Sequence, residues 1–331
     1  MKRTKRVLGL ALAAVMCMGL LAGCGGTPSN SDTADETSGT ETSEKVLNIA
    51  TIGETTTLSP LYMIADNRPT QKLLYEGLVK YVDGEIQPVL AEDWELSEDG
   101  TQLTFYLRQG VTFHDGEPFN AEAAIANIES WHINPSFASL PGVVNYTNIE
   151  AVDEYTIRLT YDTPYFAYIN DFCWPDVCTM ISPKLITQGD FQTVNGYAGT
   201  GPYIYDEYVA GQYTTFVRNE NYWGEQPYYD KIVAKYIPDN ASRVQALQTG
   251  EIDLIYGSAE LSYEDYNQAI AIDGIEGKFA PSGSTVRNII LNFNGNLSDL
   301  SVRQALAYAI DKEAISEGLT YGYEPVADTI V

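Results

Sequence analysis

The sequence predicts a mixed protein of the α/β or α+β class, because strand and helix patterns follow one another without an internal repeat. The first observation is period-two alternation, in which Leu103, Phe105 and Leu107 alternate with Thr104, Tyr106 and Arg108, as in a half-buried strand. The second is helical spacing of apolar residues at 121–131 and 301–310. The third is composition, because 44% hydrophobic and 11% aromatic residues suffice for a large core.

The elements can be predicted in order along the chain. Turn signals with Gly or Pro separate most of them, and Asn120 is placed to cap the helix that starts at Ala121. The predicted elements are a buried strand at 46–52, a helix at 67–81 interrupted by Gly77, a strand at 103–107, a helix from Ala121, a strand at 155–160, a helix at 242–248, a strand at 252–256 and an amphipathic helix at 301–310.

The N-terminus has the pattern of a secretory signal. A basic start is followed by the apolar run 7–21, which is shorter than the roughly 20 residues that a membrane-spanning helix needs. The run ends in Leu21-Ala22-Gly23-Cys24, which looks like a bacterial lipobox. We expect residues 1–23 to be a lipoprotein signal peptide and Cys24 to carry the lipid. Residues 24–45 are then a polar, disordered tether. The alternative is an ordinary signal peptide with a chance cysteine.

Charge limits the partners. The chain has 45 acidic and 19 basic residues, a net charge of −26 at pH 7. Four of the basic residues lie before residue 7, so the remainder is more acidic still. Such a chain repels phosphate backbones, which excludes nucleic acid, and it adsorbs poorly to anionic lipid. Any membrane tether is therefore covalent or hydrophobic.

The common catalytic motifs are missing. The sequence has only two histidines and contains no Gly-x-Ser-x-Gly elbow, Walker loop, His-Glu-x-x-His or Gly-x-Gly-x-x-Gly after a strand. Acidic pairs occur in polar turns, as expected by chance among 45 acids. The sequence therefore predicts no enzyme and calls for no cofactor.

Two cysteines remain beyond the signal and the lipidation motif. Cys173 and Cys178 are separated by four residues that include Pro175. Outside the cell a disulfide between them is permitted. Two buried free thiols are the alternative, and half of a metal site is disfavoured because no second Cys pair or nearby His completes it.

Three blocks resemble the family 5 extracellular solute-binding proteins, the peptide- and nickel-binding subunits of ABC importers. The first is 89–131, from VLAEDWELSEDG to FHDGEPF and the helix after it. The second is 199–256, with Gly-Thr-Gly-Pro-Tyr, Arg-Asn-x-x-Tyr-Trp and Leu-x-x-Gly-Glu-Ile-Asp. The third is 291–315, with Val-Arg-Gln-Ala-Leu-x-x-Ala-Ile. The resemblance begins near residue 46 and reaches the last residue.

The resemblance implies a type II periplasmic-binding-protein-like α/β fold with two lobes. Residues 46–290 correspond to lobe one, which is domain I with domain II inserted at roughly 77–193. Residues 291–331 correspond only to the start of lobe two. Family members are usually longer, so lobe one is expected to be nearly complete and lobe two only begun. We expect little cover for the apolar face of the helix at 301–310.

The implied function is capture of a solute in a cleft between the lobes and its delivery to the membrane permease. A peptide-like solute is the first expectation, a nickel or metal chelate is the alternative, and a truncated non-binding remnant is a third. The expected partners are this solute and the permease subunits. We expect a monomer on the outer face of the bacterial cell membrane, held by the lipid on Cys24.

The resemblance also places the ligand contacts. The stretch 63–68 follows the first strand, where Met63 could contact the solute and Arg68 could hold a carboxylate. The stretch 172–176 offers Trp174 for packing and Asp176 for a cationic group. An acid at Asp176 argues against simple transfer of the chelate-binding mode of nickel-type members. Trp131, at the end of a helix, is a weaker candidate for the cleft.

Overall fold

The computed structural model describes residues 44–62, 68–174, 177–187, 191, 194–257, 261–279 and 288–327, with only the backbone of Arg68. These residues all belong to one compact unit, Glu44–Val331. The expected signal peptide, the lipidated Cys24 and the tether up to residue 43 lie outside the described residues. Among the described residues, no helix is long and apolar enough to cross a membrane.

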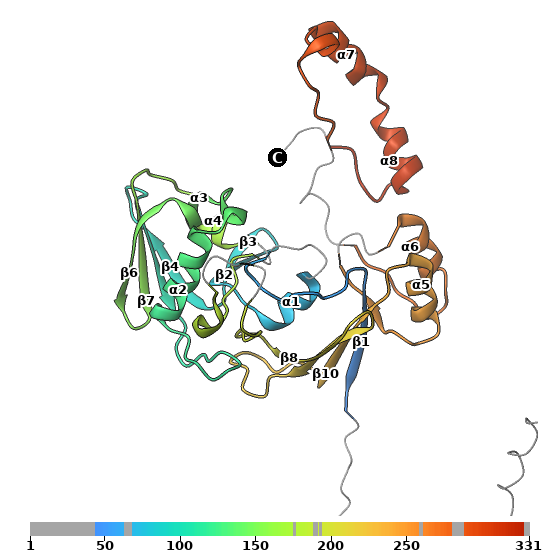
Figure 1. Cartoon of the computed structure of the whole chain (residues 1–331). Coiled ribbons are helices and arrows are strands. Elements are labelled where there is room, and N and C mark those ends of the chain that lie inside the picture. Colours follow the sequence, from blue (N-terminus) through green and yellow to red (C-terminus); the bar gives the residue numbers. More distant parts are fainter. Residues whose placement is uncertain are drawn as a thin grey trace, which may run out of the picture. The chain divides into compact units, whose positions relative to one another are not determined.

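A five-stranded sheet is built from segments far apart in the sequence (Figure 1). Its order is β11-β1-β10-β9-β8, and β1 pairs in parallel with both of its neighbours. The strands are β1 (Val46–Thr51), β8 (Tyr203–Val209), β9 (Tyr213–Arg218), β10 (Lys231–Tyr236) and β11 (Leu254–Ile255). The predicted strand at 46–52 is confirmed, whereas the strand predicted at 252–256 is only two residues long.

A second sheet lies between β1 and β8 in the sequence. It is antiparallel, with the order β4-β5-β7-β6. The strands are β4 (Ala91–Leu96), β5 (Gln102–Leu107), β6 (Tyr146–Asp153) and β7 (Thr156–Tyr161). The alternating residues Leu103, Phe105 and Leu107 are buried, as predicted. This sheet falls within the segment 77–193 that the resemblance assigns to an inserted domain.

Helix α2 (Ala121–His132) packs against strands β6 and β7 (Figure 1). The Asn120 side chain accepts a hydrogen bond from the backbone N–H of Ala123 at 3.0 Å, so the predicted cap is confirmed. Short helices α3 (Pro141–Val144) and α4 (Tyr168–Phe172) and the 3₁₀ turns Pro135–Phe137 and Pro183–Leu185 complete this region.

The helix predicted at 67–81 is shorter than expected. Helix α1 (Arg68–Leu74) ends before Gly77, and β2 (Val79–Val82) forms a hairpin with β3 (Glu85–Pro88). The chain leaves the helical path because Gly77 pairs with Thr179 in a β-bridge. A Cβ on Gly77 would lie 2.7 Å from the carbonyl oxygen of Cys178, which explains why glycine stands there.

The C-terminal part is helical. It contains α5 (Asn240–Gln248), α6 (Tyr263–Ile270), the 3₁₀ turn Gly295–Leu297, α7 (Leu300–Ala309) and α8 (Lys312–Thr320). The predicted helices at 242–248 and 301–310 correspond to α5 and α7. Tyr323, beyond α8, stacks on Tyr263 and contacts Tyr266 and Phe279, with ring centroids 4.5–5.6 Å apart. This aromatic cluster joins the last described segment to α6.

Candidate functional site

Four of the five residues expected at the ligand site lie on two segments that the structure describes in part, and the fifth, Trp131, lies on α2. Met63 and Asp176 lie outside the described residues, and Arg68 starts α1 with only its backbone described. Trp174 follows α4 and is 49% exposed. The described residues that flank 63–67 and 175–176 show how the two segments are held.

The first segment is fixed on both sides by buried polar groups. The Gln71 side chain of α1 donates to the backbone carbonyl of Ser59 at 2.8 Å. The Ser59 hydroxyl donates to the carbonyl of Phe191 at 2.8 Å, and the Asn134 amide donates to the carbonyl of Leu61 at 2.8 Å. Loss of such a buried partner costs about 1–3 kcal/mol, so the ends of the segment have a defined position.

The second segment is fixed through Asn127 of α2. Its amide oxygen accepts from the backbone N–H of Ile181 at 2.9 Å, and its amide nitrogen donates to the carbonyl of Ile181 at 2.9 Å. The same nitrogen donates to the carbonyl of Ala123 at 2.9 Å. Nearby, the backbone N–H of Met180 donates to the carbonyl of Glu76 at 2.8 Å. The chain that follows residue 176 is thus held against α2 and against the residues just before β2.

Asn127 and Asn134 form what we call the amide clamp. Both side chains are buried, and they lie seven residues apart on α2 and just beyond its end. Asn127 lies within α2, whereas Asn134 has an extended backbone and caps the 3₁₀ turn Pro135–Phe137 that follows the helix. The short stretch 127–134 therefore holds Leu61, in the first expected segment, and Ile181, a few residues after the second. Sequence analysis missed the clamp, although Asn127, an amide on the apolar side of a helical pattern, is a signal for it.

Trp131 does not have the expected position. It is 0% exposed and stacks on Phe137 with ring centroids 5.9 Å apart and planes 6° apart. Its Nε1 has no hydrogen-bond partner among the described residues. Trp131 thus fills the core beneath the clamp and offers no surface to a solute. The apolar stripe of α2 continues through it, which is the physical reason for its burial.

Cys173 and Cys178 are both free and buried, so the structure shows the two-thiol alternative. The Cys173 thiol donates to the carbonyl of Ile169 at 3.4 Å, and the Cys178 thiol donates to the carbonyl of Asp171 at 3.5 Å. Desolvation raises the pKa of Cys173 to about 11, with Asp171 adding to the effect. Desolvation also raises the pKa of Cys178. Both groups are therefore protonated and poorly nucleophilic at neutral pH.

Glu76 ties the end of α1 to the second sequence block. Its carboxylate accepts hydrogen bonds from the Thr200 hydroxyl at 2.9 Å, the Tyr222 hydroxyl at 2.7 Å and the Trp223 indole N–H at 2.7 Å. Burial raises the pKa of Glu76, and these three hydrogen bonds act in the opposite direction. The guanidinium of Arg108 lies 4.5 Å from the centroid of the Trp223 ring. The Tyr-Trp pair of the motif is thus structural.

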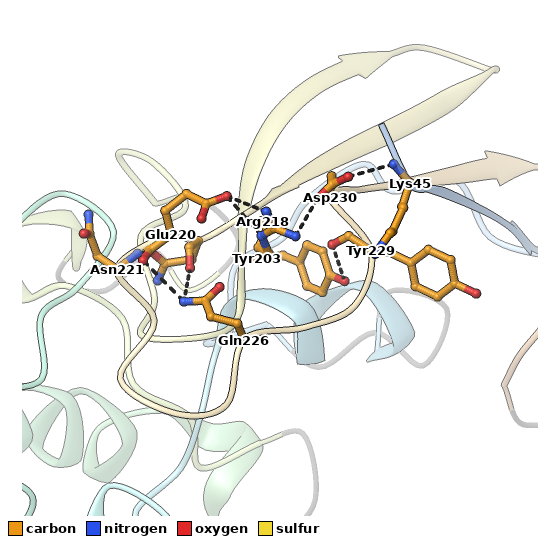
Figure 2. Close-up of polar contacts among 9 residues, drawn as sticks. Lys45, Tyr203, Arg218, Glu220, Asn221, Gln226, Tyr229 and Asp230 are labelled. Carbon is orange, nitrogen blue, oxygen red and sulfur yellow. Dashed lines mark hydrogen bonds and ion pairs between the residues drawn. The ribbon is translucent and has the colours of Figure 1, made fainter. Parts of the chain in front are cut away.

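The Arg-Asn part of the same motif anchors the sheet (Figure 2). Arg218 forms ion pairs with Asp230 at 2.5 Å and Glu220 at 2.9 Å. The backbone N–H of Lys45 donates to Asp230 at 2.7 Å. The Tyr203 hydroxyl donates to the carbonyl of Tyr229 at 3.1 Å. These contacts hold the start of β1 beside β10, so they position the sheet rather than a ligand.

The described residues give no cation site of their own. No group of three or more His, Cys, Asp or Glu side chains in this part of the chain is arranged to hold a metal ion. His114, one of the two histidines, has a structural contact, because its Nε2 lies 2.9 Å from the carbonyl oxygen of Gly201. Desolvation lowers the pKa of His114, which keeps the ring neutral.

Comparison with known proteins identifies the family. The model of the bacterial extracellular solute-binding proteins, family 5 (middle), matches residues 85–331, so the chain belongs to this family. Members of this family are binding proteins rather than enzymes. The mixed α/β fold agrees with part of a two-lobed family 5 protein.

The curated relatives are named for several different ligands. The nickel-binding periplasmic protein of Escherichia coli is 34% identical over 82% of this chain and 53% of its own length. The glutathione-binding protein GsiB of Pectobacterium atrosepticum is 33% identical over 85% of this chain and 55% of its own length. Heme-binding protein A of Haemophilus influenzae is 28% identical over 97% of this chain and 62% of its own length. The chain thus spans about half to three-fifths of these relatives.

Solved structures agree with this assignment. NikA from Brucella suis, in complex with Fe(III)-EDTA, superposes with a TM-score of 0.79 at 33% identity. The match covers 87% of this chain and 59% of NikA. NikZ from Campylobacter jejuni, in complex with Ni(L-His), gives a TM-score of 0.72 at 26% identity, over 86% of this chain and 57% of NikZ.

Proposed function

We propose that this chain is the solute-binding subunit of an ABC importer and captures a peptide-like solute. The two segments held by the amide clamp, 59–68 and 172–177, form the lobe-one side of the binding cleft. The observation that carries this proposal is the clamp itself, because the buried amides of Asn127 and Asn134 bind Ile181, just after the second segment, and Leu61, within the first. Trp174 lies within the second segment, is exposed and is available for packing on a solute.

The residue types on these segments favour a peptide. A cationic Arg68 suits a peptide carboxylate, an acidic Asp176 suits a peptide amine, and Trp174 suits a side chain. Family membership and the glutathione-binding relatives support this choice. In this account, closure of the second lobe over the bound solute creates the form that docks on the permease.

A nickel or metal chelate is the second candidate. It is favoured by 34% identity to a nickel-binding protein and by the TM-score of 0.79 to NikA. A chelate brings its own donor atoms, so the lack of a three-residue cation cluster among the described residues does not oppose it.

We also propose that the protein acts outside the membrane, anchored by lipid on Cys24. The support is the lipobox-like Leu21-Ala22-Gly23-Cys24 and the extracellular family assignment. Metabolic labelling with a palmitate analogue tests this: the label is expected in the wild-type chain and absent from C24A. Equal labelling of both chains would contradict the lipid anchor.

The solute class is tested by thermal unfolding of the chain with candidate ligands. The panel is glutathione, di- to pentapeptides, and nickel with and without histidine. A ligand at 100 times its dissociation constant adds about 2.7 kcal/mol to the free energy of unfolding. We expect an upward shift with peptides. A shift with nickel and histidine alone would select the second candidate. Cooperative unfolding with no shift for any ligand would contradict both and indicate a non-binding chain.

A further inference from the structure

A surface cleft of about 600 Å³ lies in the second sheet region. One side is formed by α3 and the start of β6, with Pro141 and Tyr146. The other side is the connection from β7 to α4, with Asp162, Pro164, Tyr165 and Tyr168. None of the residues lining this cleft belongs to the segments 59–68 and 172–177, so it is separate from the proposed solute site.

The aromatic wall of the cleft is preformed. Tyr168 stacks on Tyr161 with ring centroids 3.6 Å apart, and Tyr165 meets Tyr168 edge-on at 4.8 Å. The Tyr168 hydroxyl donates to the carbonyl of Thr163 at 2.5 Å, which holds the connecting loop against the rings. Tyr146 stands opposite Tyr161 in the β6–β7 pairing. Tyr161 and Tyr168 are almost fully buried, so the rings that a ligand would meet are those of Tyr165 and of the half-buried Tyr146, and the contact with Tyr168 holds the Tyr165 ring in place.

The charges around the cleft are of one sign. Asp162 is exposed at its edge and has no hydrogen bond or ion pair to another described residue. Glu129 lies close enough to Tyr146 to act on it electrostatically, and Asp171 acts on Tyr168 in the same way. Of the residues that the structure describes, no Lys or Arg lines the cleft. The ring of His132, the remaining basic side chain nearby, lies 4.5 Å from the ring of Tyr146.

Aromatic faces beside a carboxylate that has no partner in the described part of the chain match one chemical class of ligand. The negative faces of tyrosine rings attract ammonium and guanidinium groups, and a carboxylate neutralises the charge. Neutral and anionic ligands gain neither contact. The volume falls within the roughly 300–1,000 Å³ range of small-molecule sites. We infer that this cleft binds a small organic cation between the accessible rings of Tyr165 and Tyr146 and the carboxylate of Asp162.

Titration calorimetry with a charge-matched pair of probes tests this inference. Choline and 3,3-dimethyl-1-butanol have nearly the same shape and differ in charge. We expect saturable binding of choline or of arginine methyl ester. We expect binding of the neutral alcohol to be at least about tenfold weaker. Equal affinity for choline and the alcohol, or no binding of either cation, would overturn the inference.

Two variants locate the binding within the cleft. D162N removes the charge, and Y165A removes a ring, at positions exposed enough to keep the fold. Each is expected to weaken cation binding by about threefold to tenfold. The matched control is E276Q, an exposed acid that does not line the cleft. Unchanged affinity in D162N, at an unchanged unfolding temperature, would exclude this site. The result is independent of whether the chain binds a peptide.

Discussion

At the scale of single residues, Glu76 makes the most consequential contact of the family motif. Its carboxylate accepts three hydrogen bonds, from the side chains of Thr200, Tyr222 and Trp223. Burial nevertheless raises its pKa. A raised pKa means that the folded state binds this proton more tightly than the unfolded chain. The contribution to stability is thus fully present below about pH 4.3 and is lost as the pH rises through the folded-state value.

The prediction concerns E76Q and pH. Because glutamine does not titrate, the free energy of unfolding of E76Q should increase relative to wild type as the pH rises from 4 to 7. Urea unfolding at both pH values measures this. E264Q, an exposed glutamate in α6, should show no such change. A difference between E76Q and wild type that is the same at both pH values would show that Glu76 does not titrate abnormally.

Local patterns could predict some side-chain roles but not others. The cap by Asn120 is a local effect and was predicted correctly. Trp131 was assigned to the cleft because its position at a helix end is known from sequence, whereas its packing on Phe137 and the core is not. The amide clamp joins residues 54 and 73 positions apart, which no local pattern reveals. Met63, Arg68, Trp174 and Asp176 stay predictions as ligand contacts.

At the scale of elements, the Gly-Thr-Gly segment is explained by close backbone contact with α1. A Cβ on Gly199 would lie 1.9 Å from the carbonyl oxygen of Leu74, and one on Gly201 would lie 2.6 Å from that of Leu73. The backbone N–H of Gly201 donates to the Leu74 carbonyl at 2.9 Å. The two glycines therefore let this segment approach the end of α1 closely enough to hydrogen-bond to one of its free carbonyl groups.

We predict opposite effects for two glycine substitutions. G199A should lower the free energy of unfolding by about 1–3 kcal/mol or more, because the backbone must move to admit a methyl group. G318A should raise it by about 0.5–1 kcal/mol, because Gly318 lies within α8 and a Cβ there meets no atom within 4 Å. Chemical denaturation of both variants is the measurement. A loss in G318A equal to that in G199A would contradict the packing argument.

The elements with strong local signals were predicted, and the exceptions have physical causes. Alternation identified β5 and β7, and spacing identified α2, α5 and α7. The helix predicted up to residue 81 failed because the bridge between Gly77 and Thr179 redirects the chain. That bridge depends on a partner about a hundred residues away. Helices α6 and α8 have few apolar residues at regular spacing and were not predicted.

At the scale of the whole molecule, α7 and α8 contain no buried residue. Leu300 is 58% exposed, Tyr308 is 90% exposed and Leu319 is 71% exposed. The apolar faces of these helices are therefore uncovered, as expected for residues that only begin a second lobe. Exposed apolar area of this kind favours association.

Charged substitutions on these helices should reduce association without loss of stability. The double variant L306K/L319K is expected to bind less of a hydrophobic dye and to sediment as a smaller species than wild type. Its free energy of unfolding should change by less than about 0.5 kcal/mol, because neither side chain is buried. Y81K, an exposed residue of β2, is the control. Loss of cooperative unfolding in the double variant would show that these faces are covered after all.

The central claim is that the two segments positioned by the amide clamp bind a peptide-like solute. The most direct measurement is calorimetric titration of wild type, W174A and Y228A with glutathione and short peptides. Trp174 and Tyr228 are both exposed aromatic residues, but only Trp174 lies within one of the two segments. We expect saturable peptide binding that W174A weakens at least about tenfold and Y228A leaves unchanged. Peptide binding that W174A does not alter, or no peptide binding by a cooperatively folded chain, would contradict the account.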